Sequence, residues 1–75
     1  MLSKKDKIKS KIKKLNAIRA IYQRDFEEIE RRYKEKEISK EDFEKKKQRY
    51  EIRMDKLKEK IRRLEDKIDQ LEEKK

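Results

Sequence analysis

Lysines are the residues of this sequence whose spacing best suits a chemical role. Four of them follow one another at steps of three, four and three residues, which would place them on one side of a helix: Lys4, Lys7, Lys11 and Lys14. Ammonium groups at this spacing bind phosphate oxygens as point charges, and each neutralised phosphate releases condensed counterions. The first fourteen residues hold seven lysines and one aspartate, which is +6 of the net charge of +9. We therefore expect nucleic-acid binding at these four lysines, through the RNA or DNA backbone and without base readout.

The same four lysines have a simpler alternative role. They would keep their helix in water and complement carboxylates near the other end of the chain, if the two ends lie side by side: Glu65, Asp66, Asp69, Glu72 and Glu73. The sequence leaves both interpretations open.

Three isoleucines form a second candidate site, because they fall outside the main apolar pattern of the chain. Ile18 and Ile21 continue the side on which the four lysines lie, and Ile52 lies in the second half. In a helical hairpin, all three would lie at similar heights along the rod. This predicts a contact surface for a partner protein or for a second copy of the chain.

Catalysis and metal binding are not expected from this composition. The chain has no Cys and no His, the side chains that most often act as thiol nucleophiles, general bases and transition-metal ligands. It also has no Gly for a phosphate-binding loop. Carboxylates are plentiful, but a two-helix rod has no cleft that would desolvate a pair of them. We expect no enzymatic activity, no cofactor and no metal site.

The elements that position these residues follow from one apolar pattern. In the second half, apolar residues recur without a break at alternating steps of four and three: Tyr50, Met54, Leu57, Ile61, Leu64, Ile68 and Leu71. The first half carries the same steps with one gap: Ile8, Ile12, Leu15, Tyr22, Phe26, Ile29 and Tyr33. This heptad pattern is typical of coiled-coil helices. We therefore predict an all-α fold.

A turn is expected where the apolar stripe weakens. The stripe is interrupted there by Lys36, Lys40 and Lys47. Ser39 can cap a new helix through its side-chain oxygen. We predict a single domain over residues 1–75, with helices over about 4–36 and 40–73 and a turn near 37–39 that folds them into an antiparallel hairpin.

The alternative architecture is a single long helix in a parallel coiled coil, since the heptad phase does not slip across the weak region. A parallel pair would stack each cation of the stripe against its own copy, which is repulsive. The hairpin instead lets long cationic side chains lie along apolar neighbours. It also brings Tyr33 near Phe43, so we favour it.

Residues 38–46, Ile-Ser-Lys-Glu-Asp-Phe-Glu-Lys-Lys, resemble the short helical SHOCT-type motif. The resemblance covers these nine residues and lacks the glycine that usually precedes the motif. It implies a short helical segment here and no function by itself.

Together these observations predict a small basic coiled-coil protein of the cytoplasm. Two hairpins are expected to pair into a dimeric four-helix bundle. The architecture is similar to that of the plasmid Rop RNA-binding hairpins, an analogy of fold without a shared motif. The alternative function is a structural or adaptor coiled coil that mediates protein–protein interaction without nucleic acid. A membrane is the least favoured partner, because the apolar stripe is needed between the helices.

Overall fold

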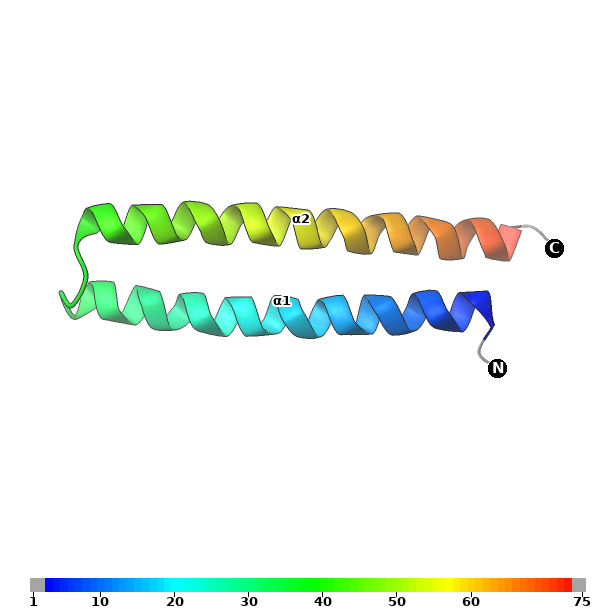
Figure 1. Cartoon of the computed structure of the whole chain (residues 1–75), viewed down its shortest axis with the longest axis horizontal. Coiled ribbons are helices and arrows are strands. Elements are labelled where there is room, and N and C mark those ends of the chain that lie inside the picture. Colours follow the sequence, from blue (N-terminus) through cyan, green and yellow to red (C-terminus); the bar gives the residue numbers. More distant parts are fainter. Residues whose placement is uncertain (1–2, 74–75) are drawn as a thin grey trace.

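The protein folds as two long helices that lie side by side and run in opposite directions. The computed structural model describes residues 3–73, with α1 at Lys4–Lys34 and α2 at Lys40–Glu73, and these residues include no strand. The rod measures 57 × 19 × 13 Å, and both termini lie at one end of it, called here the free end (Figure 1). The predicted all-α hairpin is confirmed. Residues 1–2 and 74–75 of the predicted domain lie outside the described residues.

A serine caps the N-terminus of each helix. The Ser3 hydroxyl accepts a hydrogen bond from the Asp6 amide at 3.2 Å, and the Ser39 hydroxyl accepts one from the Asp42 amide at the same distance. Each cap satisfies an amide that has no partner within its helix. Both aspartates also place negative charge near the positive end of a helix dipole. The cap predicted at Ser39 is therefore present.

The turn closes α1 earlier than the sequence pattern predicts. The helix ends at Lys34 because the next residues form a Schellman motif, in which the Lys36 amide donates to the Tyr33 carbonyl at 3.1 Å and the Glu37 amide to the Arg32 carbonyl at 2.8 Å. Lys36 takes the left-handed conformation, with φ of 62°, which glycine usually supplies at this point. A lysine therefore takes here a conformation that is normally glycine's.

The two helices pack through the predicted apolar stripe. Near the free end and the middle of the rod, four stripe residues are buried: Ile8, Met54, Leu57 and Ile61. Near the turn, aromatic rings replace aliphatic side chains: Tyr33 stacks on Phe43 and Phe26 on Tyr50, with centroids 4.3 Å apart in each pair. The expected approach of Tyr33 and Phe43 is confirmed. No side chain in the described part of the chain is less than 2% exposed, so the core is one narrow seam.

Candidate functional site

The four lysines predicted to bind phosphate share one side of α1. Lys4, Lys7, Lys11 and Lys14, called here the lysine face, all lie within the helix and all are exposed. Among the side chains that the structure describes, none of the four takes part in an ion pair. Their charges are therefore available to an external anion.

A second row of cations, not predicted from the sequence, runs along α2. Its seven members follow one another at alternating steps of three and four and are all exposed: Lys46, Arg49, Arg53, Lys56, Lys60, Arg63 and Lys67. At these steps, helical residues lie on one side of the helix. The row, called here the α2 cation row, spans about 32 Å at ~1.5 Å per residue.

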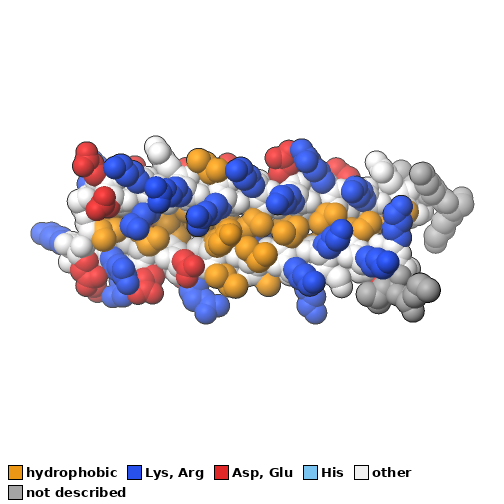
Figure 2. Space-filling model, in the orientation of Figure 1, with side chains coloured by type: hydrophobic (Ala, Val, Ile, Leu, Met, Phe, Trp, Pro, Cys, Tyr) orange, Lys and Arg blue, Asp and Glu red, His pale blue; other side chains and the backbone are white. Residues whose placement is uncertain are grey.

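Part of the lysine face and part of the α2 cation row border one groove between the helices. The lining comprises five cations and three apolar residues: Lys11, Lys14, Lys60, Arg63 and Lys67, with Leu15, Ile18 and Leu64. This cation-lined groove is open to solvent and has a volume of about 490 Å³, and none of the described residues that line it is a carboxylate. Figure 2 shows an apolar strip between the helices with Lys and Arg side chains on both sides of it. The structure thus joins two features that the sequence separates, a cationic face and an exposed apolar surface.

The pairing of basic and acidic chain ends does occur, but it uses a different lysine. Lys5 Nζ lies 2.6 Å from Glu72 Oε1, across the two helices at the free end. The hydrogen bond from Lys5 and its charge, with a smaller effect from the charge of Lys9, hold the pKa of Glu72 below its ordinary value. Neither Lys5 nor Lys9 belongs to the lysine face. Complementing Glu72 therefore does not occupy that face.

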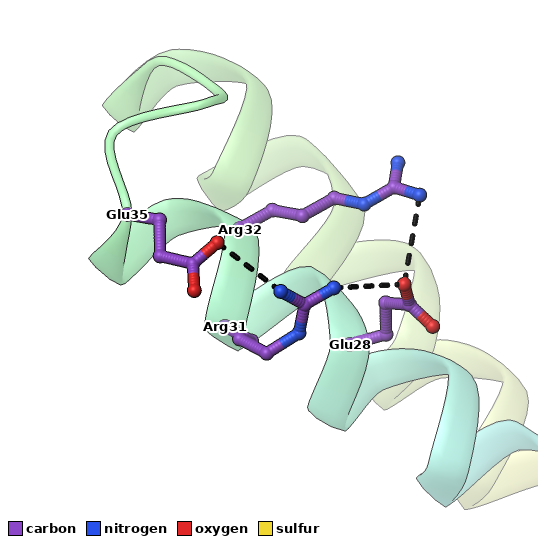
Figure 3. Close-up of polar contacts among 4 residues, drawn as sticks. All are labelled: Glu28, Arg31, Arg32 and Glu35. Atoms are coloured by element: carbon purple, nitrogen blue, oxygen red, sulfur yellow. Dashed lines mark hydrogen bonds and ion pairs between the residues drawn. The ribbon is translucent and has the colours of Figure 1, made fainter.

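At the turn end, by contrast, arginines pair with carboxylates of their own helix. The guanidinium nitrogens of Arg31 lie 3.1 Å from Oε1 of Glu28 and 3.1 Å from Oε2 of Glu35 (Figure 3). A guanidinium nitrogen of Arg32 lies 3.6 Å from Oε1 of Glu28. The hydrogen bond to Glu28, followed by the charge of Glu35, raises the pKa of Arg31. All four side chains are exposed, so water screens these ion pairs and each contributes little to stability. Their main effect is local neutrality, which confines the excess positive charge to the free end.

The three candidate isoleucines do not form one surface. Ile18 lines the cation-lined groove and is 37% exposed. Ile21, 50% exposed, follows it by three residues on the same side of α1. Ile52, 56% exposed, lies two residues from both Tyr50 and Met54 of the seam, or about 200° around α2, so it faces away from α1. Similar height along the rod does not bring Ile52 to the other two.

Residues 3–73 contain neither a cluster of metal ligands nor a helix that could cross a membrane. No group of three or more Asp, Glu, His or Cys residues among them is placed to hold a metal ion. Neither α1 nor α2, over the same residues, contains a segment long and apolar enough to cross a membrane.

The comparisons with known proteins add no functional argument to this geometry. No family model matches the chain, and neither a curated protein nor a solved structure matches it.

Proposed function

We propose that this protein binds the phosphate backbone of RNA or DNA without base readout, through the lysine face extended by the α2 cation row. The observation that supports it is that two lysines of the lysine face and three cations of the α2 cation row line one groove whose described lining carries no carboxylate: Lys11, Lys14, Lys60, Arg63 and Lys67. Sequence reasoning alone suggested four contacts; the hairpin adds a parallel row from a distant part of the chain. Lysine binds phosphate as a flexible point charge, which suits a backbone ligand.

The spacing of the cations also suits a polyanion. Neighbours in each row are separated by about 5 Å along the helix axis, and the duplex offers a negative charge every ~1.7 Å of its own axis. Each cation therefore has a phosphate within reach of its flexible side chain. If six cations neutralise phosphates, affinity should fall by about 10³-fold between ~50 and ~200 mM salt.

The test replaces the lysine face by four glutamines, Lys4→Gln, Lys7→Gln, Lys11→Gln and Lys14→Gln. A matched control removes four exposed lysines that lie elsewhere on the helices: Lys13→Gln, Lys34→Gln, Lys45→Gln and Lys58→Gln. Both variants lose the same net charge. Binding of a labelled RNA and a labelled DNA duplex is followed by fluorescence anisotropy over a range of salt concentrations.

We expect the variant of the lysine face to lose most of its affinity at low salt. The slope of log K against log salt should become shallower by about 3–4, because each lost duplex contact removes ~0.9. The control should keep the wild-type slope. Equal losses in the two variants would show that affinity follows net charge alone, and no binding by the wild-type chain at low salt would remove the proposal.

A second candidate function is an adaptor that engages a helix of another protein. Ile18 and Ile21 favour it, because both are large, apolar and exposed on one side of α1. Such a complex is expected to survive ~0.5 M salt, where contacts with phosphate are screened. It should be lost in the double variant Ile18→Ser, Ile21→Ser and kept in Ile52→Ser.

We also propose that two hairpins pair in the cytoplasm as a four-helix bundle. A narrow seam without fully buried side chains is marginal for a single hairpin of this size. The cation-lined groove is a poor surface for that pairing, since a two-fold axis would place two sets of cations against each other. Light scattering tests the assembly: a mass of 9.5 kDa at all accessible concentrations would contradict it.

A further inference from the structure

We infer that the cation-lined groove is a docking site for one amphipathic helix with acidic flanks, supplied by a partner protein. This inference specifies the partner of the adaptor function proposed above, and it does not depend on nucleic-acid binding. It begins with the composition of the groove, in which Leu15, Ile18 and Leu64 form an apolar floor between two cationic borders. An occupant must match both parts.

The apolar floor favours a helix over an extended chain. A peptide placed over this floor loses water from its backbone amides and carbonyls, and two packed helices offer no strand edge to pair with them. A helix satisfies these groups internally and presents only side chains to the floor. It would lie along the groove as the third member of a bundle, at the usual spacing of packed helices.

The cationic borders of the groove favour a helix with negatively charged side chains on its flanks. Lys11 and Lys14 lie on one side, and Lys60 and Lys67 on the other, while the fifth cation, Arg63, is paired with Glu59 at 2.7 Å. Glu or Asp residues on both flanks of a docked helix would meet these lysines. A second copy of this chain would instead bring the same cations face to face, so self-association through the groove is disfavoured.

The length of the groove sets the length of the occupant. A smaller depression on the same side, bordered by Lys4 and Ile8, shares Lys67 with the groove and continues it toward the free end. From Lys4 to Ile18 the continuous surface spans about 21 Å of α1, or roughly four turns of helix. A partner helix of at least that length would use all of it.

The hairpin itself has reason to accept a third helix. Among residues 3–73, only four apolar side chains are buried, and Ile18 remains more than one-third exposed. A docked helix would cover Ile18, Leu15 and Leu64 without changing the fold of the hairpin. Removal of apolar surface from water is the main driving force of protein association.

The experiment uses two synthetic, fluorescein-labelled peptides and the full-length protein. Both peptides are helical over about three heptads with Leu at the a and d positions. One carries Glu at all flanking positions, and the matched peptide carries Gln there. Fluorescence anisotropy measures binding to the wild-type chain and to three variants: Ile18→Ser, Ile52→Ser, and the double variant Lys14→Gln, Lys60→Gln. Circular dichroism confirms that each variant remains helical.

We expect the Glu peptide to bind at least about tenfold more tightly than the Gln peptide near ~0.1 M salt, because it meets several cations. Ile18→Ser should weaken it by about tenfold, the effect of withdrawing a partly buried isoleucine from the contact. The double lysine variant should reduce the preference for Glu over Gln. Ile52→Ser should bind as the wild type does, since Ile52 faces away from α1.

Equal binding of the two peptides would overturn the acidic specificity and leave the adaptor function intact. No binding of either peptide, or an unchanged affinity in Ile18→Ser, would overturn docking in this groove. If neither peptide binds, and a labelled RNA binds the wild type but binds the double variant Lys14→Gln, Lys60→Gln more weakly, the groove is assigned to nucleic acid alone.

Discussion

The left-handed backbone at Lys36 offers a substitution whose effect depends on the whole architecture. At a φ of 62°, a residue with a Cβ atom costs about 1–2 kcal/mol relative to the right-handed region, and glycine avoids this cost. Glycine in turn loses more backbone freedom on folding than a residue with a Cβ atom does, and this entropy loss costs about 0.5–1 kcal/mol of stability. We therefore expect Lys36→Gly to increase the free energy of unfolding by about 0.5–1 kcal/mol.

The sign of this change separates the hairpin from one continuous helix. Inside a long helix, glycine at position 36 would decrease stability by about 1 kcal/mol. Thermal unfolding followed by far-ultraviolet circular dichroism measures the difference. A change of 1 kcal/mol shifts the Tm of a domain this small by about 4–8 °C, so Lys36→Gly should raise it by about 2–8 °C.

Two controls isolate the backbone effect, with all melts at one protein concentration. Lys36→Ala removes the charge and keeps Cβ in the left-handed region, so it should not reproduce the rise in Tm. Lys45→Gly places glycine at an exposed interior position of α2 and should lower stability by about 1 kcal/mol. A fall in Tm for Lys36→Gly, similar to that of Lys45→Gly, would refute the turn described here.

Three further predictions concern the cap, the interhelical ion pair and the seam. Ser39→Ala removes the hydroxyl that caps α2 and should cost about 1 kcal/mol in urea unfolding, whereas Ser10→Ala, at an exposed position inside α1, should be neutral or slightly stabilising. The pKa of Glu72 is lowered in the folded state, so Glu72 stabilises the hairpin at pH values above its ordinary pKa and loses this effect as the pH falls through the lowered pKa. NMR titration should show that the pKa of Glu72 is higher in Lys5→Gln than in the wild type. An unchanged pKa in Lys5→Gln would exclude the ion pair. Leu57→Ala opens a gap in the seam and should cost about 2–5 kcal/mol, so a midpoint of urea unfolding close to that of the wild type would contradict the packing.

The apolar stripe predicted the two helices, and the cationic residues within it, together with the cap at Ser39, favoured the hairpin over one long helix. The stacking of Tyr33 on Phe43 follows directly from a turn near residue 38. α1 ends at Lys34, two residues before the expected bound of about 36. Lys36 has no sequence signal for the left-handed region, since that signal is normally a glycine.

The functional surface was less predictable because it combines both helices. The α2 cation row has a regular spacing, but along the sequence its members alternate with carboxylates such as Glu59 and Glu65 that lie on other sides of the helix. Ile52 was grouped with Ile18 from height alone, without its angle around the helix axis. Sequence periodicity gives that angle at about 100° per residue, so the side of α2 on which Ile52 lies follows from the sequence.

The neutral turn end has a consequence for how the molecule meets a charged target. Residues 21–55 contain eleven Lys or Arg and eleven Asp or Glu, whereas residues 3–20 carry eight cations and one carboxylate. Because the dipoles of antiparallel helices largely cancel, these side chains give the rod an electric moment along its long axis. In the field of a polyanion such a rod rotates before contact, so that its free end approaches first. Its association rate should therefore fall with ionic strength, even if apolar contacts provide most of the affinity of the complex.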